Sequence, residues 1–388
     1  MGKHMRVAIV TETWPPEING VALTVQALAR GLSALGHEVE LVRPRQESDP
    51  ADAAPGEIEE VLLRGAALPR YRSLRFGLPA QRILHRRWSL RRPDVLYIAT
   101  EGPLGHSALS ASRRLGIPAC TGFHTRFDDF ARHYGLGLLT PAVFAWLRRF
   151  HNRASATLVP TVELADFLGR NGFHSVRLLR RAVDTELFDP GRRDDALRAE
   201  WGLAPDDLAI VHVGRIAAEK NLDLAVRAFH AIRRREPRAR FIVVGDGPAR
   251  APLAAQHPDI LFAGIRRGGD LARHYACGDL FLFPSLTETF GNVTLEALAS
   301  GVPVVAFDYG AAHEHIHDAQ AGARVSRGDD DAFIAAALAL ADAVARHGGD
   351  AASPLRTTAR RSVVDLSPVS VARHFADMLG ELSTRRAA

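Results

Sequence analysis

Short apolar runs alternate with longer stretches of helical periodicity along this chain. The first apolar run, residues 6–10, leads through a proline-rich loop to a helical pattern over 21–35, and a second apolar run follows at 39–42. Gly36 is suited to end the helix, because glycine accepts the left-handed backbone conformation common at helix C-termini. A strand, a helix and a second strand in this order predict a βαβ unit with parallel strands.

The same alternation continues through both halves of the chain. Further strands are predicted at 95–98, 119–122 and 157–160, and then at 208–213, 241–245, 260–263, 280–284 and 304–307. A linker is predicted at 184–193, where Asp, Pro and Gly lie close together. The pattern predicts an α/β protein of two doubly wound domains, residues 5–187 and 188–367. A ligand cleft is expected between them, at the carboxyl ends of the strands.

Length and composition agree with two globular domains. The chain has 388 residues, enough for two cores. No segment approaches the roughly 18 uninterrupted apolar residues of a membrane-spanning helix, and no signal peptide precedes the first strand, so we expect a cytoplasmic protein. Residues 1–4 are typical of a cloning remnant. Cys120 and Cys277 fit no disulfide or metal motif, so we expect neither a disulfide nor a structural metal.

The segment 281–300 carries the most informative polar pattern, because a strand leads into a helix through a polar loop. The first amides of the helix, at 292–294, lack partners within the helix and can bind a phosphate. Glu296, inside that helix, could accept hydrogen bonds from a ribose diol, and Glu288, on the loop, could hold a second polyhydroxylated group. The alternative is that both glutamates are simply solvated.

Two cations follow the strand predicted at 208–213. Apart from Lys3, Lys220 is the only lysine in a chain rich in arginine, which favours a need for a compact ammonium group at that position. Together with Arg215 it could clamp a diphosphate and stabilise the charge that develops when the diphosphate leaves, a task that a metal ion performs in other enzymes. The alternative is a solvated loop with an ion pair through Glu219.

These motifs resemble those of the retaining GT-B glycosyltransferases of family 4. The matching patterns are Gly-Arg-x4-Lys after a strand and Glu-x7-Glu spanning Phe-Gly-Asn, and the resemblance covers almost the whole chain. The stretches TETWPPEING, TGFHTRFDDF and VVAFDYGAAHEHI are especially similar to bacterial GDP-mannose-dependent α-mannosyltransferases. Two departures are Asn19-Gly20 in place of Gly-Gly, and Ala311 as the second position of a Gly-Gly-x-x-Glu motif in which Glu314 matches. The resemblance implies two Rossmann-like domains, with a C-terminal helix, about 368–388, packed back on the N-terminal domain.

The resemblance also implies a donor site. Glu296 would hold the ribose, Glu288 with the backbone of 290–292 would hold the transferred sugar, and the backbone of 264–266 would meet the nucleobase. Gly20 would let the N-terminal loop approach the donor phosphate. The expected donor-binding residues are Asn19, Gly20, Arg215, Lys220, Gly264, Ile265, Arg266, Glu288, Phe290, Gly291, Asn292, Val293, Thr294 and Glu296.

The catalytic residues that the resemblance implies are His124, Arg215, Lys220 and Glu288. The cations would neutralise the leaving nucleoside diphosphate, and His124 would lie near the reacting sugar; the alternative is a buried, structural histidine. No Asp-x-Asp metal signature stands in the expected place, so we expect metal-independent transfer without a cofactor. No carboxylate stands out as a covalent nucleophile, which favours displacement on the front face of the sugar.

An arginine-rich stretch indicates the acceptor side. Residues 64–93 hold nine arginines and no Asp or Glu. Such a surface suits anionic lipid headgroups, so we expect a lipid or lipid-linked acceptor and contact with the inner face of the cell membrane; a merely solvated surface is the alternative. Nucleic acid is not expected, because no nucleic-acid-binding motif is present. The residues expected at the membrane or acceptor are Arg70, Arg72, Arg75, Arg82, Arg86, Arg87 and Trp88.

The expected function is therefore transfer of a hexose, with mannose from GDP-mannose as the leading donor, onto a lipid or glycolipid with retention of configuration. A UDP-sugar-dependent glucosyl, glucuronosyl or sulfoquinovosyl transferase is the alternative. An NAD oxidoreductase would need Gly-x-Gly-x-x-Gly after a strand, which the chain lacks. A pyridoxal-phosphate phosphorylase could use Lys220 as a Schiff base, but the chain is short for one. An inactive nucleotide-binding protein would have no need to retain both cations and both glutamates.

Overall fold

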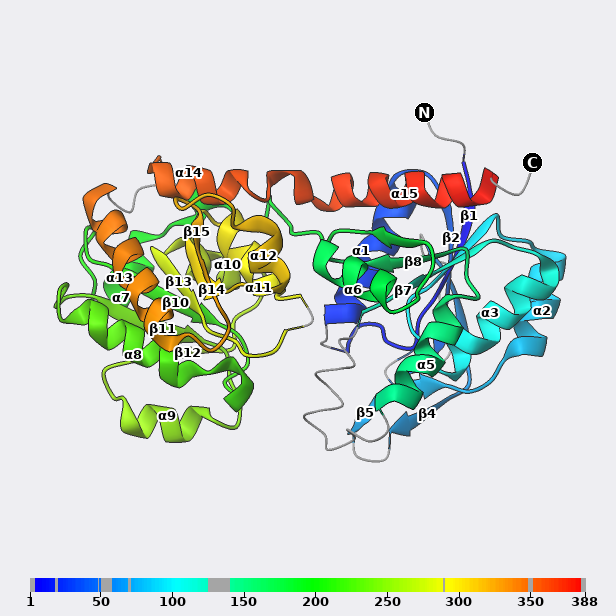
Figure 1. Ribbon diagram of the computed structural model, residues 1–388, viewed down its shortest axis with the longest axis horizontal. Coiled ribbons are helices and arrows are strands. Elements are labelled where there is room, and N and C mark those ends of the chain that lie inside the picture. The colour runs from blue at the N-terminus through cyan, green and yellow to red at the C-terminus, as the bar shows by residue number, and fades with distance from the viewer. Residues whose placement is uncertain are drawn as a thin grey trace. The chain divides into compact units, whose positions relative to one another are not determined.

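The computed structural model describes residues 4–17, 20–47, 49, 58–68, 71–124, 140–288, 290–347 and 352–384 (Figure 1). Internal contacts divide the chain into two compact units. The N-terminal unit comprises Met1–Ala182 and Pro368–Ala388, and the C-terminal unit comprises Val183–Ser367. Asn19 and Arg70, two of the expected site residues, lie outside the described residues.

The N-terminal unit is built on a parallel sheet of seven strands in the order β3-β2-β1-β6-β7-β8-β9. The strands are β1 Arg6–Val10, β2 Glu38–Pro44, β3 Glu59–Leu63, β6 Val95–Ile98, β7 Ala119–Gly122, β8 Ala156–Val159 and β9 Val176–Leu178. A separate antiparallel hairpin joins β4 Gly65–Leu68 to β5 Tyr71–Gly77. Strand β1 pairs with β2 on one side and β6 on the other, so the strand order reverses at β1.

Helices cover this sheet, and the last helix of the chain is one of them. They are α1 Gly20–Ala34, α2 Gln81–Leu90, α3 Pro103–Leu115, α5 Thr140–His151, α6 Val162–Arg170 and α15 Pro368–Thr384. Helix α15, red in Figure 1, lies beside α1 and places Phe375 and Leu379 in one core with Leu28 and Leu32. This confirms that the C-terminal helix packs on the N-terminal domain.

The C-terminal unit is built on a parallel sheet of six strands in the order β12-β11-β10-β13-β14-β15. The strands are β10 Ala209–Val213, β11 Arg240–Val244, β12 Leu261–Gly264, β13 Leu280–Phe283, β14 Val304–Phe307 and β15 Gly322–Val325. The helices and 3-10 turns are η1 Pro190–Arg192, α7 Asp195–Glu200, η2 Ala218–Lys220, α8 Leu222–Arg233, α9 Arg250–Gln256, α10 Gly268–Ala276, α11 Asn292–Ala299, α12 Gly310–His315, α13 Asp330–His347, α14 Pro354–Arg361 and η3 Val364–Leu366.

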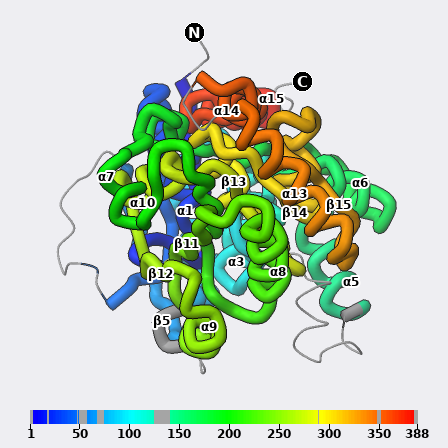
Figure 2. The backbone as a smooth tube through the Cα atoms, turned by 90° about the vertical axis from the view of Figure 1, so that its left-hand side faces the viewer, coloured from blue at the N-terminus to red at the C-terminus, as the bar shows by residue number. Residues whose placement is uncertain are grey.

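Both faces of the second sheet are buried, because successive side chains of each strand point to opposite sides. Ile210 and Leu280 belong to the core under α8 and α13, which lie next to one another in Figure 2. Val211 and Phe281 belong to the core on the other face, with Leu295 of α11. The central strands β13 and β14 are therefore continuous apolar runs, and because all strands of the sheet are parallel, their carboxyl ends share one edge.

No helix within the described part of the chain is long and apolar enough to cross a membrane.

Candidate active site

The loops after β10 and β13 meet at the carboxyl edge of the sheet in the C-terminal unit. The two strands are neighbours in the sheet. The amide of Leu286, in the loop after β13, donates to the carbonyl of Glu219, in the loop after β10, at 2.8 Å. The two motifs that the sequence presents separately, Gly-Arg-x4-Lys and Glu-x7-Glu, therefore lie side by side.

Lys220 and Glu288 form an ion pair in this place. Their side chains are only 15% and 17% exposed, so water screens the pair weakly. The Ser285 hydroxyl donates to Oε1 of Glu288 at 3.0 Å, and Nζ of Lys220 lies 5.6 Å from the centroid of the Phe283 ring. The structure thus brings together Lys220, which the sequence assigned to the diphosphate of a donor, and Glu288, which the sequence assigned to its sugar.

Beneath this pair lies His212 of β10, a residue that the sequence did not point to. Its Nδ1 lies 3.0 Å from the Leu282 carbonyl oxygen, and its ring stacks on Phe283 at 5.9 Å between centroids. Burial, aided by the charge of Lys220, lowers the pKa of His212 to about 4. The ring is therefore neutral at physiological pH and adds no charge below the ion pair.

Arg215 points to solvent, with 64% of its side chain exposed, and pairs with Glu219. Burial alone would raise the pKa of Glu219, but hydrogen bonds from its own amide and from Arg215 outweigh burial and lower it. Both cations of the loop therefore have carboxylate partners. Arg215 pairs as the solvated-loop alternative requires, whereas Lys220 is held at the site.

The start of α11 offers free backbone donors. Gly291 precedes the helix with φ 93°, a conformation that residues with a side chain rarely adopt, and no side chain caps the helix there. The amide of Thr294 donates to the carbonyl of Gly291 at 3.0 Å, whereas the amides of Asn292 and Val293 meet no acceptor within the described residues. The carbonyl of Phe290 is fixed by the amide of Ala311 at 2.7 Å.

Glu296 lies one turn further along α11 and is half-buried. Its Oε2 accepts a hydrogen bond from the Tyr275 hydroxyl of α10 at 2.8 Å. Burial raises the pKa of Glu296, and the bond from Tyr275 only partly opposes this. One carboxylate oxygen is thereby fixed, while Oε1 has no partner in the described structure. Tyr275 gave no signal in the sequence, where it is one aromatic residue of an amphipathic helix.

The loop after β12 contains two of the residues expected at the nucleobase, Ile265 and Arg266. Ile265, in the loop expected at the nucleobase, is 62% exposed. Arg266 folds back on its own loop, with Nε donating to the Ala263 carbonyl at 3.0 Å and Nη1 3.2 Å from Asp270. The guanidinium of Arg266 is therefore engaged by Ala263 and Asp270.

A pocket lies beside Glu288 and the start of α11. It is lined by Phe283, Glu288, Phe290, Thr294, Ala306, Phe307, Tyr309 and Ala312.

In the N-terminal unit, His124 follows β7 and lies in a buried network. Its Nε2 lies 2.7 Å from the Tyr97 hydroxyl, and its Nδ1 lies 3.1 Å from Nη2 of Arg181. A Cβ at Gly122 would lie 2.5 Å from both Nε2 and the Tyr97 hydroxyl, so only glycine permits this approach. Because a guanidinium can only donate, Nδ1 must accept, and Nε2 carries the proton.

Burial and the charge of Arg181 hold the pKa of His124 well below its usual range, so the imidazole is neutral. Burial also lowers the pKa of Arg181 to about 10, which leaves it charged at neutral pH. Arg181 donates to the Thr24 hydroxyl, which donates to the carbonyl of Gly20 at 2.7 Å. The network therefore joins the start of α1 to His124. The sequence did not reveal Arg181, because a single arginine beside Arg180 looks like a surface residue.

Comparison with known proteins agrees with these motifs. Residues 18–187 match the family described as Glycosyltransferase Family 4, and residues 207–343 match Glycosyl transferases group 1. A GDP-mannose-dependent alpha-mannosyltransferase of Mycolicibacterium smegmatis is 35% identical over 393 residues, which cover 99% of this chain and 100% of that protein. The chain belongs to the family 4 glycosyltransferases. These are retaining hexosyltransferases, and the activity class expected from the sequence is confirmed.

Two further comparisons bear on this glycosyltransferase. An alpha-monoglucosyldiacylglycerol synthase of Acholeplasma laidlawii is 29% identical over 324 residues, covering 78% of this chain and 80% of that one. The solved sucrose-phosphate synthase of Thermosynechococcus elongatus superimposes with a TM-score of 0.74 at 17% identity, covering 99% of this chain and 100% of that one. The second comparison confirms the GT-B fold.

Part of the expected membrane surface of the glycosyltransferase is wrong. Trp88 is fully buried, and its Nε1 donates to Oε1 of Glu40 at 2.8 Å. Nε of Arg87 donates to Oε2 of the same glutamate at 2.9 Å, and Arg87 also pairs with Glu59. The prediction failed because Glu40 and Glu59, on β2 and β3, lie outside the stretch 64–93 that was judged free of acids.

Of the other arginines in this stretch, some pack against the protein and others are exposed to solvent. Arg75 is largely buried and donates to the Gly65 carbonyl at 3.2 Å. For Arg72 only the backbone, in β5, is described. Arg82 and Arg86 are exposed on α2 and pair with no carboxylate within the described residues. The positive surface of α2 is therefore narrower than the sequence indicated.

Proposed function

We propose that this enzyme transfers a hexose from a nucleotide diphosphate sugar to a lipid or glycolipid acceptor, with mannose from GDP-mannose as the leading donor. The observation that carries the proposal is the mostly buried Lys220–Glu288 pair beside the uncapped start of α11. The choice of GDP-mannose rests on the relative of that name, which is similar over its full length. A UDP-sugar donor is the second candidate, favoured by the likeness to the glucosyldiacylglycerol synthase.

The donor would lie along the carboxyl edge of the second sheet. Oε1 of Glu296 would accept hydrogen bonds from the ribose, while the amides of Asn292 and Val293 would donate to a phosphate. Lys220 would then exchange its carboxylate partner for the diphosphate. This exchange frees Glu288 to accept hydrogen bonds from the hydroxyl groups of the sugar. One ion pair thus serves two ends of the same donor.

The transfer step would need no metal ion. As the bond between the anomeric carbon and the diphosphate oxygen breaks, negative charge grows on that oxygen, and fixed cations such as Lys220 stabilise it. The acceptor hydroxyl would attack from the same face and give its proton to the departing phosphate oxygen. Configuration is then retained, and neither Glu288 nor Glu296 acts as a nucleophile.

His124 would act by position and not by proton transfer. Both of its ring nitrogens are already engaged, one by Tyr97 and one by Arg181. Its low pKa also removes the charged form. We assign to His124 a positioning role at the carboxyl end of β7, and the family resemblance implies that this residue lies near the reacting sugar.

The acceptor would be reached at a membrane, on its cytoplasmic face. The exposed side of α2 combines Arg82 and Arg86 with Ile83 and Leu90, which are 57% and 82% exposed. Cations beside exposed aliphatic side chains suit an interface with anionic lipid. This smaller surface replaces the arginine-rich stretch as the proposed contact.

A thermal-shift screen tests the donor. GDP-mannose should raise Tm more than UDP-glucose, UDP-glucuronate or UDP-sulfoquinovose at equal concentration, because a bound ligand stabilises the folded state by mass action. Glu296→Ala should lose most of that shift. A larger shift with a UDP-sugar would favour the second candidate, and no shift with any of the four donors would contradict the proposal.

A further inference from the structure

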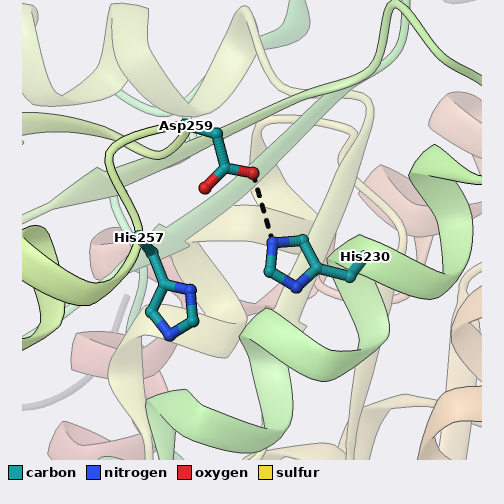
Figure 3. Close-up of side chains that lie close together, drawn as sticks. All are labelled: His230, His257 and Asp259. Carbon is teal, nitrogen blue, oxygen red and sulfur yellow. Dashed lines mark hydrogen bonds and ion pairs between the residues drawn. The ribbon is translucent and has the colours of Figure 1, made fainter.

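A second cluster of reactive side chains lies on the C-terminal unit, formed by residues outside the loops of the proposed donor site. His230 lies in the last turn of α8, while His257 and Asp259 lie on the turn between α9 and β12. One nitrogen of each imidazole and one carboxylate oxygen all lie within 4.8 Å of one another. Figure 3 shows the three side chains converging from the helix and the turn. All three are half-buried, so solvent reaches them.

The backbone around the cluster is fixed. The amide of His257 donates to the carbonyl of Leu253 at 2.9 Å, and the amide of Ile260 donates to the carbonyl of His257 at 3.1 Å. These bonds close the turn that carries His257 and Asp259. The third group, His230, stands on a regular helix. Only side-chain rotation is needed to bring the three groups closer.

The distances suit one small ion. Nε2 of His230 lies 3.2 Å from Oδ2 of Asp259. Two ligands of one tetrahedral zinc ion, each about 2.0–2.1 Å from the metal, stand roughly 3.3 Å apart. That pair is therefore already at coordination spacing. The widest separation in the cluster is at most 4.8 Å, so the ring of His257 has to move by no more than about 1.5 Å.

The chemistry of the three ligands indicates which metal ions can bind. Two imidazoles and one carboxylate suit zinc, cobalt or nickel, whereas magnesium and calcium prefer oxygen ligands alone. A site of three protein ligands leaves a position for water, as the solvent exposure of the cluster allows.

Arg233 is the competitor of a metal at this place. Its Nη1 lies 2.6 Å from the same Oδ2 of Asp259 that His230 approaches. A metal ion at this place must share Oδ2 of Asp259 with Arg233.

We propose that His230, His257 and Asp259 bind one divalent transition-metal ion of the zinc class. The ion ties the end of α8 to the turn that precedes β12 and stabilises the C-terminal unit. The ligands come from two separate elements, so no continuous sequence motif identifies the site. The site therefore departs from the expectation that the chain has no structural metal, and it is separate from the transfer step, for which we propose no metal ion.

The test uses the full chain after treatment with a chelator. Zinc chloride should raise Tm, magnesium chloride should not, and isothermal titration should find one zinc site that is lost in His257→Ala. His347→Ala is the matched control, because His347 is an exposed histidine in the last turn of α13 of the same unit. Arg233→Gln should bind zinc several-fold more tightly, since it removes the competing cation.

Two results would overturn the site. One is a zinc-dependent rise in Tm of equal size in the wild type and in His257→Ala, which would place the ion elsewhere. The other is no zinc binding by the wild type. Asp259→Asn supplies a second variant in case His257→Ala does not fold, and the metal-free Tm of each variant checks folding. Donor binding is measured separately, so failure of this site leaves the proposed transferase activity untouched.

Discussion

Lys220 is the residue on which the proposed chemistry depends most. Replacing it with alanine removes the cation that would neutralise the departing diphosphate. We expect kcat to fall by roughly 10²-fold or more, the scale of losing one positioned charge or donor in a dry site. Steady-state transfer measured at saturating donor checks this.

The matched control for Lys220→Ala is Arg227→Ala, which removes an exposed cation of the same unit that pairs with Asp330. Surface pairs of this kind contribute about 0–1 kcal/mol, so the control should keep normal turnover. Normal turnover in Lys220→Ala would instead exclude the proposed neutralisation.

Arg181 should act on the reaction through His124. In Arg181→Leu, the imidazole loses both its hydrogen-bond donor and the neighbouring charge, so the pKa of His124 should rise toward its ordinary value. Since a raised pKa lets the ring take up a proton at higher pH, activity should decline earlier on the acid side than in the wild type. The measurement is a pH profile of kcat together with an NMR titration of His124.

Arg181→Lys provides the comparison, because it keeps the charge and loses the forked donor geometry. It should leave the pH profile near that of the wild type. A merely structural arginine would lower stability in both variants and leave the titration of His124 unmoved in both, and that result would contradict the positioning role.

At the scale of elements, the buried strands were easier to predict from the sequence than the edge strands or the site residues whose partners are distant in the chain. The strands β1, β6, β10, β13 and β14 are fully buried and almost entirely apolar, with Arg6 and His212 as the exceptions, and the sequence located each strand within one or two residues. β3 and β9 escaped prediction because they lie at the sheet edges and contain half-exposed and charged residues. Residues of the site whose partners come from distant segments, such as Arg181, leave no local pattern at all.

The start of α3 is held by a carboxylate from another element. Oε1 of Glu12, in the loop after β1, accepts the amide of Leu104 at 2.9 Å. Burial nevertheless raises the pKa of Glu12 from 4.5 to about 7, although backbone amides of α3 and β5 oppose it. In the folded protein this group therefore holds its proton to higher pH than in the unfolded chain.

The raised pKa of Glu12 makes the stability of the folded protein depend on pH. Between about pH 4.5 and 7 the folded state binds more protons, so Glu12 makes the free energy of unfolding decrease as pH rises, by on the order of 3 kcal/mol across the window. Glu12→Gln keeps an oxygen for Leu104 and removes the ionisation. We expect it to raise Tm at pH 8 and to change Tm little at pH 5, as measured by calorimetry. An equal change at both pH values would contradict the assignment.

At the scale of the whole molecule, the proposed membrane contact depends on two exposed arginines of α2, for which the described part of the chain supplies no carboxylate partner. Two arginines of the original stretch, Arg87 and Arg91, are neutralised by glutamates of β2 and β3. Counting charges along a sequence therefore overestimates the positive charge of a surface when neighbouring strands supply the opposite charge. Arg82 and Arg86 escape this neutralisation within the described structure.

Charge reversal separates a specific lipid surface from a general positive charge. We expect Arg82→Glu with Arg86→Glu to reduce co-sedimentation with phosphatidylglycerol vesicles strongly, because each basic residue near such a surface contributes about 1 kcal/mol. Arg234→Glu with Arg361→Glu changes the net charge equally on exposed residues of the C-terminal unit and should bind vesicles as the wild type does. Ile83→Ser should weaken binding to the same vesicles even at high salt, since apolar insertion is not screened. Unchanged binding in the α2 double variant, or equal loss in both double variants, would show that α2 is not the surface that meets the membrane.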